Sequence, residues 1–249
     1  MGEEIMIESI VLKNYRQFKT LEVNCNKDKN IFIGDNGAGK STILEALKFV
    51  LSGSFSGISK IGIHNLFNCN VINDYLAAYL ENKATELPII MVEVYLDAQN
   101  DKVKDIFKLE GKHNSKNQKL YGMRLVIELD EDYRADFYSC LEDTQNVFPF
   151  EYYTVRYSTF SDETYNSFKK PFKYKWEFIN TSEINVEIAL KHYVTHIFES
   201  VTEEGDRARI FNGLRTKSKE YIGELYSENR IKEGEYRIDV DGVYSSDIC

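Results

Sequence analysis

The stretch N-I-F-I-G-D-N-G-A-G-K-S-T-I-L-E-A-L-K-F-V-L, from Asn30 to Leu51, decides how this chain folds. Its apolar residues Ile31 to Ile33 predict a short buried strand that stops at Gly34. The pattern G-x-x-x-x-G-K-S follows on Gly34 to Ser41. An amphipathic helix comes next, with the apolar positions of one face at Ile43, Leu44, Leu47, Val50 and Leu51. Strand, glycine loop and helix in this order predict a phosphate-binding loop.

This loop is predicted to bind ATP and Mg²⁺. Glycines lack a Cβ, so the backbone can wrap closely and direct successive N–H groups at a phosphate, as does the N-terminus of the helix. Lys40 would place its ammonium between the β- and γ-phosphates, and the hydroxyl of Ser41 would be a ligand of Mg²⁺. The predicted nucleotide contacts in the loop are Gly34, Asp35, Asn36, Gly37, Ala38, Gly39, Lys40, Ser41 and Thr42.

Length and composition are those of a globular chain of one large or two small domains. The 249 residues are 43% hydrophobic and 29% charged, enough to bury a sizeable core. The net charge is −9, but residues 1–60 carry 8 basic and 7 acidic side chains, or +1, which leaves −10 for the rest. The balance does not favour a basic nucleic-acid module, so any DNA contact is expected from a local patch or another segment.

Cysteine usage and hydropathy suggest a cytoplasmic location. The four cysteines lie far apart without zinc-ligand spacing, and are predicted to be reduced thiols. No apolar run approaches the ~20 residues of a membrane span, and the N-terminus lacks the apolar core of a signal peptide. We therefore expect no membrane partner.

Strands are predicted on both sides of the loop and helix. Two precede it, at residues 5–12 and 21–25, and the helix should stop near Gly53. An irregular stretch (54–70) and a helix (73–82) come next, then candidate strands at 89–96, 121–129, 133–141, 150–157 and 172–179. Glu131-Asp132 is interpreted as the turn of an antiparallel hairpin, and residues 111–119 as a mobile polar loop.

The last third of the chain changes to helical periodicity. A helix is expected from Thr181-Ser182-Glu183 to about residue 201 and a second over residues 204–226, with a strand-like piece at 236–240. We therefore predict two parts. Residues 1–180 would form the N-terminal half of an ATPase head, and residues 181–249 a helical extension.

The stretch I-E-S-I-V-L-K-N-Y-R-Q-F-K at Ile7–Lys19, followed by I-F-I-G-D-N-G-A-G-K-S-T-I-L-E-A-L, resembles the opening of RecF/SMC-like ABC ATPases. It is most similar to the OLD (overcoming lysogenization defect) family of ATP-dependent nucleases. The resemblance implies an α/β P-loop NTPase of ABC/RecF type, with an added antiparallel β layer and a C-terminal helical pair. It further implies DNA as a partner of the parent protein, and a homo-oligomer that completes its ATP site by face-to-face dimerisation.

The resemblance also implies that the loop after the first strand helps to hold the nucleotide. The matching residues are Lys13, Asn14, Tyr15 and Arg16. Lys13 or Arg16 could neutralise phosphate charge, and Tyr15 could stack on adenine. The alternative is a surface turn with ordinary charges.

Catalytic residues are not identified from the sequence. The family's signature loop, Walker B carboxylates and Toprim nuclease domain have no placeable counterpart, so the chain is interpreted as truncated before them. Leu51–Ser54 imitates a signature loop directly after the helix, and Leu125–Glu131 imitates Walker B on an alternating strand. Three glutamines are equal candidates for the Q-loop: Gln99, Gln118 and Gln145.

Four functions follow from these observations. The first is the ATP-binding part of an OLD-like endonuclease in prokaryotic antiphage defence, and the second a RecF/SMC-like DNA-repair ATPase without a nuclease. A nucleotide-dependent interaction module is the third, and a transporter ATPase the fourth. Nucleotide binding is predicted directly from the residues, whereas hydrolysis and DNA cleavage need residues that the sequence does not reveal.

Overall fold

A computed structural model describes residues 6–83, 85–97, 105–144 and 147–172, together with single positions at 174, 176, 178 and between 206 and 221. The chain divides into two compact units, Met1–Phe178 and Ile179–Cys249. In the second unit the described positions between Asp206 and Tyr221 are helical, as predicted. The predicted helix at 181–201 and strand at 236–240 lie outside the described residues.

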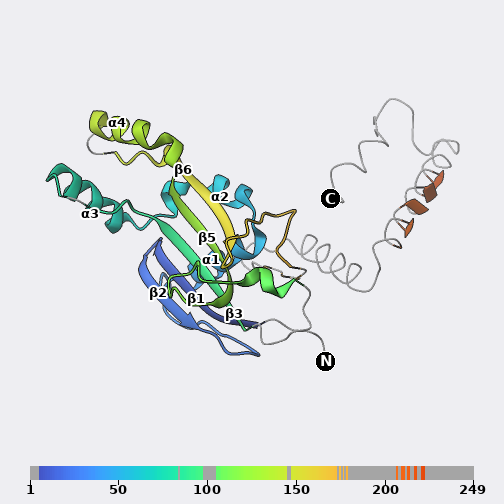
Figure 1. Ribbon diagram of the computed structural model, residues 1–249. Coiled ribbons are helices and arrows are strands. Elements are labelled where there is room, and N and C mark those ends of the chain that lie inside the picture. Colours follow the sequence, from blue (N-terminus) through green and yellow to red (C-terminus); the bar gives the residue numbers. More distant parts are fainter. Residues whose placement is uncertain are drawn as a thin grey trace. The chain divides into compact units, whose positions relative to one another are not determined.

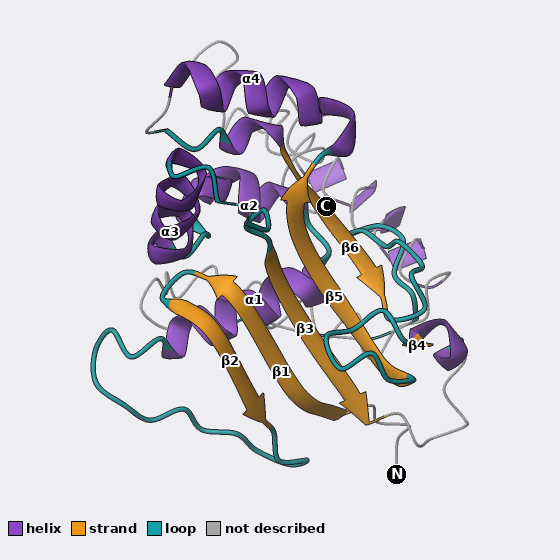
Figure 2. Ribbon diagram, turned by 60° about the vertical axis from the view of Figure 1, so that its left-hand side comes forward, coloured by secondary structure: helices purple, strands orange, loops and turns teal. Residues whose placement is uncertain are grey.

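The first unit is built on an antiparallel sheet of six strands (Figures 1 and 2). Its order is β2-β1-β3-β5-β4, and β6 also pairs with β5. Every pair is antiparallel. The strands are β1 (Met6–Tyr15), β2 (Phe18–Asn24), β3 (Ile90–Asp97), β4 (Glu110–Gly111), β5 (Leu120–Leu129) and β6 (Tyr153–Thr159). The predicted strands at 5–12, 21–25, 89–96 and 121–129 are thus confirmed within a few residues.

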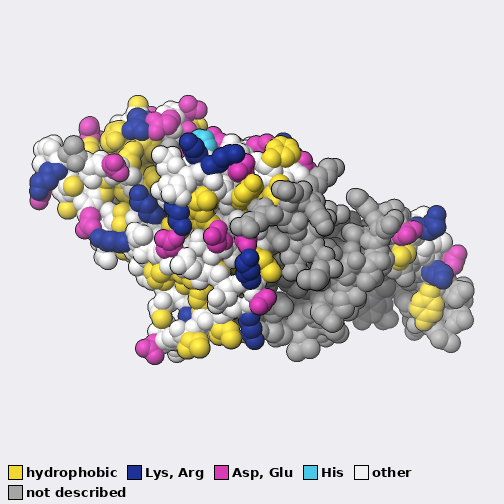
Figure 3. Space-filling view, turned by 60° about the horizontal axis from the view of Figure 1, so that its bottom comes forward, with side chains coloured by type: hydrophobic (Ala, Val, Ile, Leu, Met, Phe, Trp, Pro, Cys, Tyr) yellow, Lys and Arg dark blue, Asp and Glu magenta, His cyan; other side chains and the backbone are white. Residues whose placement is uncertain are grey.

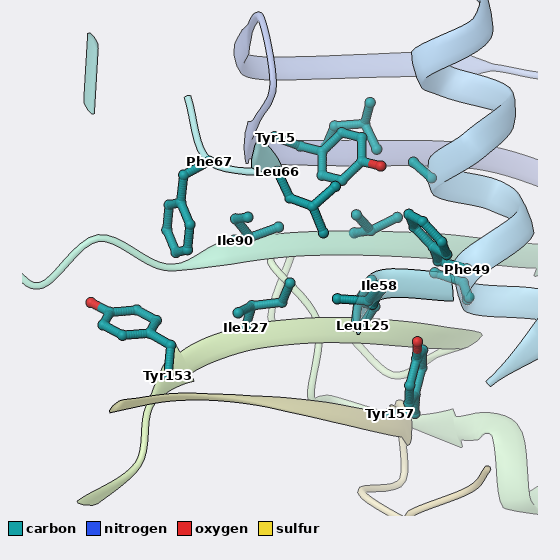
Figure 4. Packing of buried hydrophobic residues seen from close by; sticks show 14 of the residues in the cluster. Tyr15, Phe49, Ile58, Leu66, Phe67, Ile90, Leu125, Ile127, Tyr153 and Tyr157 are labelled. Atoms are coloured by element: carbon teal, nitrogen blue, oxygen red, sulfur yellow. The ribbon is translucent and has the colours of Figure 1, made fainter. Parts of the chain in front are cut away.

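One face of the sheet is apolar and carries the core. Residues that alternate along each strand meet across the strands, as in the row Leu12, Val92 and Leu125, all fully buried. Figure 4 shows this face packed beneath Leu66 and Phe49, with Tyr15 between the sheet and a helix. The opposite face carries charged residues. Glu93 of β3 and Arg124 of β5, for example, are directly opposite each other, next to the Val92–Leu125 pair. This alternation fixes the register, because a shift by one residue would exchange the two faces.

Helix α1 (Lys40–Ser52) lies across the apolar face (Figure 2). It buries one stripe of side chains and ends at Gly53, whose φ of 55° is left-handed, so the predicted stop is confirmed. The last carbonyls of α1 accept hydrogen bonds from Tyr165, Lys170 and Tyr174. Burial lowers the pKa of Lys170. These bonds satisfy groups that the end of a helix otherwise leaves without partners.

The described part of the first unit contains three further helices, of which α3 and α4 lie beyond one end of the sheet (Figure 1). They are α2 (Phe55–Ile61), α3 (Cys69–Leu80) and α4 (Arg134–Thr144). Helix α3 confirms the predicted helix but begins earlier, where the side chain of Asn68 accepts a bond from the N–H of Val71. Short 3₁₀ turns occupy Ile63–Asn65, Ile106–Leu109, Glu131–Tyr133 and Phe150–Tyr152.

The predicted hairpin at Glu131-Asp132 is wrong. Residues 131–133 form a 3₁₀ turn, and α4 replaces the expected strand at 133–141. Phe137 and Leu141 are buried at i and i+4, which is a helical spacing. The stretch 54–70, expected to be irregular, likewise contains α2 and the 3₁₀ turn that follows it.

The predicted strand before the glycine loop is also absent. Residues 31–35 have no strand partner, and the side chains of Ile31 and Ile33 are 68% and 91% exposed. Phe32 alone of the three packs against the core. The described positions of the expected strand at 172–179 are not in a strand either. A strand needs hydrogen-bonding neighbours, and these two segments have none among the described residues.

Two wider features complete the description of the first unit. Among the described residues, no helix is long and apolar enough to cross a membrane. Basic and acidic side chains are interspersed over the face drawn in Figure 3, and several Lys or Arg side chains gather beside a histidine there.

Candidate nucleotide-binding site

The glycine loop leads directly into the first turn of α1. Gly37 and Gly39 have φ angles of 84° and 96°, a left-handed conformation that side chains disfavour. Gly39 is the N-cap of α1, and no side chain caps the helix. The N–H groups of the first turn therefore remain available to an anion, and the helix dipole favours one there. The residues present thus fit a bound phosphate chain.

Lys40 directs its ammonium back into the loop. Its Nζ donates hydrogen bonds to the carbonyl oxygens of Gly34 and Asp35, both at 2.7 Å. Ser41, the predicted Mg²⁺ ligand, follows in the first turn of α1 and is exposed. The ammonium, the exposed hydroxyl and the helix N-terminus therefore lie within one short loop, as phosphate and Mg²⁺ binding requires.

The tip of the β1–β2 hairpin packs directly on this loop. Nε2 of Gln17 lies 3.5 Å from the carbonyl oxygen of Gly37, and the hydroxyl of Thr42 donates to Oε1 of Gln17 at 3.2 Å. A Cβ at Gly39 would lie 2.3 Å from the ring of Phe18. Gly39 therefore serves two needs, a left-handed backbone and close contact with the hairpin. Gln17 and Phe18 were not predicted as site residues.

Glu45 of α1 anchors the hairpin to the helix. Its carboxylate accepts a bond from the hydroxyl of Tyr15 at 2.7 Å and two from Arg16, at 3.0 and 2.9 Å. Burial and the neighbouring carboxylate both raise the pKa of Tyr15. Partial burial works against the charge of Arg16, but Glu45 outweighs it and raises the pKa of the guanidinium. A single carboxylate therefore fixes two residues of the hairpin.

The hairpin backbone is held in an unusual conformation. Asn14 and Arg16 have φ angles of 56° and 48°, which non-glycine residues seldom adopt. The side chain of Asn68 donates to the carbonyl of Arg16 at 2.6 Å, and the N–H of Arg16 donates to the carbonyl of Leu66 at 2.7 Å. Asn14 also donates through Nδ2 to the carbonyl of Ile89. The surroundings thus over-determine the turn, as strained conformations require.

The four hairpin residues predicted to hold nucleotide therefore divide by position. Arg16 lies beside α1, whereas Lys13 pairs with Thr20 and Met91 on the face of the sheet away from α1. Tyr15 is fully buried, so its ring offers no face to adenine in this structure. We correct the role of Tyr15 from stacking to anchoring. Lys13, Asn14 and Arg16 as nucleotide contacts stay predictions.

In the Walker B-like stretch Leu125–Glu131, the two glutamates contact arginines. Glu128 pairs with Thr154 in the sheet register, on the face away from α1, and its carboxylate lies 3.4 Å from Arg156. The carboxylate of Glu131 accepts two hydrogen bonds from Arg134, which lowers its pKa. No cluster of three His, Cys, Asp or Glu side chains suited to a metal occurs in the described part of the chain.

Comparison with known families agrees with this geometry. The sequence model of a family described as "AAA domain" matches residues 9–242, most of the chain. The chain belongs to this AAA-domain family. The match and the antiparallel sheet bearing the P-loop helix agree with the predicted α/β fold of ABC/RecF type. They support a RecF/SMC-like P-loop ATPase, whereas membership of the OLD family is not confirmed.

Curated relatives match over shorter stretches. The "DNA replication and repair protein RecF" of Rickettsia canadensis is 43% identical over 51 residues, which are 20% of this chain and 14% of that protein. RecF of Rickettsia rickettsii is 33% identical over 81 residues, 32% of this chain and 22% of the relative. RecF of Clostridium botulinum is 44% identical over 43 residues, 17% and 12% of the two chains. The matches thus span less than a quarter of each relative.

A solved structure is similar at a lower level. It comes from work on "ATP-driven dimerization and DNA stimulated activation of SMC ATPases", and is 18% identical with a TM-score of 0.32. The alignment covers 51% of this chain and 64% of that one. A likeness with this TM-score is too weak to assign a fold or a function to this chain.

Proposed function

We propose that the chain is the ATP-binding part of a RecF/SMC-like ATPase, with Mg²⁺ held by Ser41. The observation that carries the proposal is the loop of left-handed glycines before an uncapped helix, with the Lys40 ammonium inside it. When ATP binds, the N–H groups of the first turn of α1 would donate hydrogen bonds to phosphate oxygens. Lys40 would exchange its two carbonyl partners for the β- and γ-phosphates. Bound Mg²⁺ would supply charge neutralisation between those phosphates.

The proposal includes a DNA-related role in the parent protein. The RecF matches support a repair ATPase without a nuclease, and the resemblance of Ile7–Lys19 and the glycine loop supports an OLD-like endonuclease in antiphage defence. Incubating the full-length parent protein with supercoiled plasmid and ATP–Mg²⁺ separates the two. Nicking that depends on the protein favours the endonuclease, and intact plasmid favours the repair ATPase. A cytoplasmic location is part of either proposal.

We expect the 249-residue chain to bind ATP but to hydrolyse it very slowly. Efficient P-loop ATPases orient the attacking water with a dedicated residue. The carboxylates considered as the base are turned away or engaged. Glu128 faces the other side of the sheet, Glu131 accepts two hydrogen bonds from Arg134, and Glu45 holds Tyr15 and Arg16. Phosphate release, measured colorimetrically, should therefore be close to background. Robust release that is lost in Lys40→Ala would contradict this.

We also expect nucleotide-dependent association of the full-length parent protein. Residues 34–38 of the loop are exposed, and Ile31 and Ile33 beside them present apolar surface that a second surface can cover. Light scattering with a non-hydrolysable ATP analogue should show a homodimer that is absent or weaker without nucleotide. A strictly monomeric protein under both conditions would count against the ABC-type arrangement.

A further inference from the structure

Residues 112–119, here called the lysine loop, cross the face of the sheet opposite α1. The N–H of His113 donates to the carbonyl of Phe160, just after β6, at 3.0 Å. The N–H and hydroxyl of Ser115 donate to the carboxylate of Glu93 on β3, at 2.8 and 2.6 Å. Lys116 then reaches Glu22 on β2 at 2.7 Å. The loop therefore extends from the β6 side of the sheet to β2.

The shape of the lysine loop is fixed by a few inward contacts. The nearly buried Asn114 donates to the carbonyls of Gly111 and Gln118, and its side-chain oxygen accepts from the N–H of Lys116. The ammonium of Lys116 also lies 4.5 Å from the centre of the Tyr95 ring. The sequence predicted a mobile loop, whereas these bonds hold it on the sheet.

The outward side of the lysine loop is basic, although the chain is acidic. Residues 112–119 contain three lysines and no acidic residue, or +3, against −9 for the whole chain. Lys112 and Lys119 are exposed. Lys112 makes no ion pair with the described residues, and Lys119 pairs with Glu110 at 3.0 Å while 65% exposed. Water screens such exposed pairs and leaves them weak, so a phosphate can replace the glutamate.

We propose that the lysine loop binds the phosphate backbone of duplex DNA. Docking the loop on the sheet uses Asn114, Ser115 and Lys116, and it needs neither Lys112 nor Lys119. A loop already fixed in shape loses little conformational entropy on binding. Contacts to phosphates position a protein without reading sequence, so binding should be non-specific and strongly salt-dependent. The choice of DNA among polyanions rests on the proposed DNA-related function.

The test is a titration of a fluorescein-labelled duplex of mixed sequence with the full 249-residue chain, followed by anisotropy. The double variant Lys112→Glu/Lys119→Glu should weaken binding about tenfold at low salt, because it removes two phosphate contacts and adds repulsion. The slope of log K against log salt should become shallower by about 2. The neutral double variant Lys112→Ala/Lys119→Ala should show a smaller loss in the same direction, with no added acidic groups.

The matched control is Lys60→Glu/Lys83→Glu, which changes the net charge equally at two exposed positions outside the loop. It should retain most of the affinity. Equal losses of affinity in both charge-reversal variants, or no DNA binding by the unsubstituted 249-residue chain at low salt, would overturn the proposal. So would equally tight binding of an acidic polypeptide such as polyglutamate. Nucleotide titrations of the same variants keep this outcome separate from the proposed ATP binding, which depends on Lys40.

Discussion

Replacing Lys40 by alanine should weaken ATP binding about 100-fold, or about 2.7 kcal/mol. The ammonium already donates two bonds of 2.7 Å within the loop, so it is positioned where phosphate oxygens would replace the carbonyls of Gly34 and Asp35. Charge-assisted hydrogen bonds contribute about 1.5–3 kcal/mol each, and alanine can replace none of them. Titration of a fluorescent ATP analogue in the presence of Mg²⁺ measures the effect.

The matched control for this prediction is Lys60→Ala. Lys60 is exposed in the last turn of α2, outside the glycine loop, so its loss removes the same charge elsewhere. We expect Lys60→Ala to bind ATP within about twofold of the affinity of the unsubstituted chain, which is the size of a long-range charge effect. If Lys40→Ala bound as tightly as Lys60→Ala, with unchanged circular dichroism, the glycine loop would not be the nucleotide site.

Local signals predicted much of the fold and the centre of the site. The glycine pattern, the period of α1 and the left-handed stop at Gly53 are all encoded within a few residues of where they act. Alternation in β3 and β5 likewise reports the two faces of the sheet. The helix α4 was missed although Phe137 and Leu141 carry its spacing, because Glu131-Asp132 was interpreted as a hairpin turn instead of the acidic first turn after the Asp130 cap.

Features that depend on distant partners could not be predicted. Ile31–Ile33 have the composition of a buried strand, but composition does not supply the neighbouring strands that would bury them. Tyr15 was interpreted as a stacking surface because its burial depends on Leu12, Leu66 and α1, which the local pattern does not place together. The role of Glu45 was hidden for the same reason, since it lies 29 and 30 positions from its two hydrogen-bonding partners.

Removing the Glu45 carboxylate should destabilise the first unit. We expect Glu45→Ala to lower the free energy of unfolding by about 2–3 kcal/mol, because the buried hydroxyl of Tyr15 and the guanidinium of Arg16 both lose their acceptor. The side chains of Arg16 and Glu45 are 32% and 26% exposed, so water recovers part of the ion pair and keeps the loss below that of a fully buried one.

Urea denaturation of Glu45→Ala, Arg16→Ala and the double variant measures this loss and divides it. Alanine is the best helix former, so lower helix propensity of α1 cannot be the cause. A double variant that costs less than the sum of the two single ones would show the Arg16–Glu45 coupling, and the remainder belongs to Tyr15. The P-loop residues stay intact in Glu45→Ala, so ATP–Mg²⁺ should still raise its urea midpoint. A Glu45→Ala chain within about 0.5 kcal/mol of the parent would mean that the hairpin does not depend on this carboxylate.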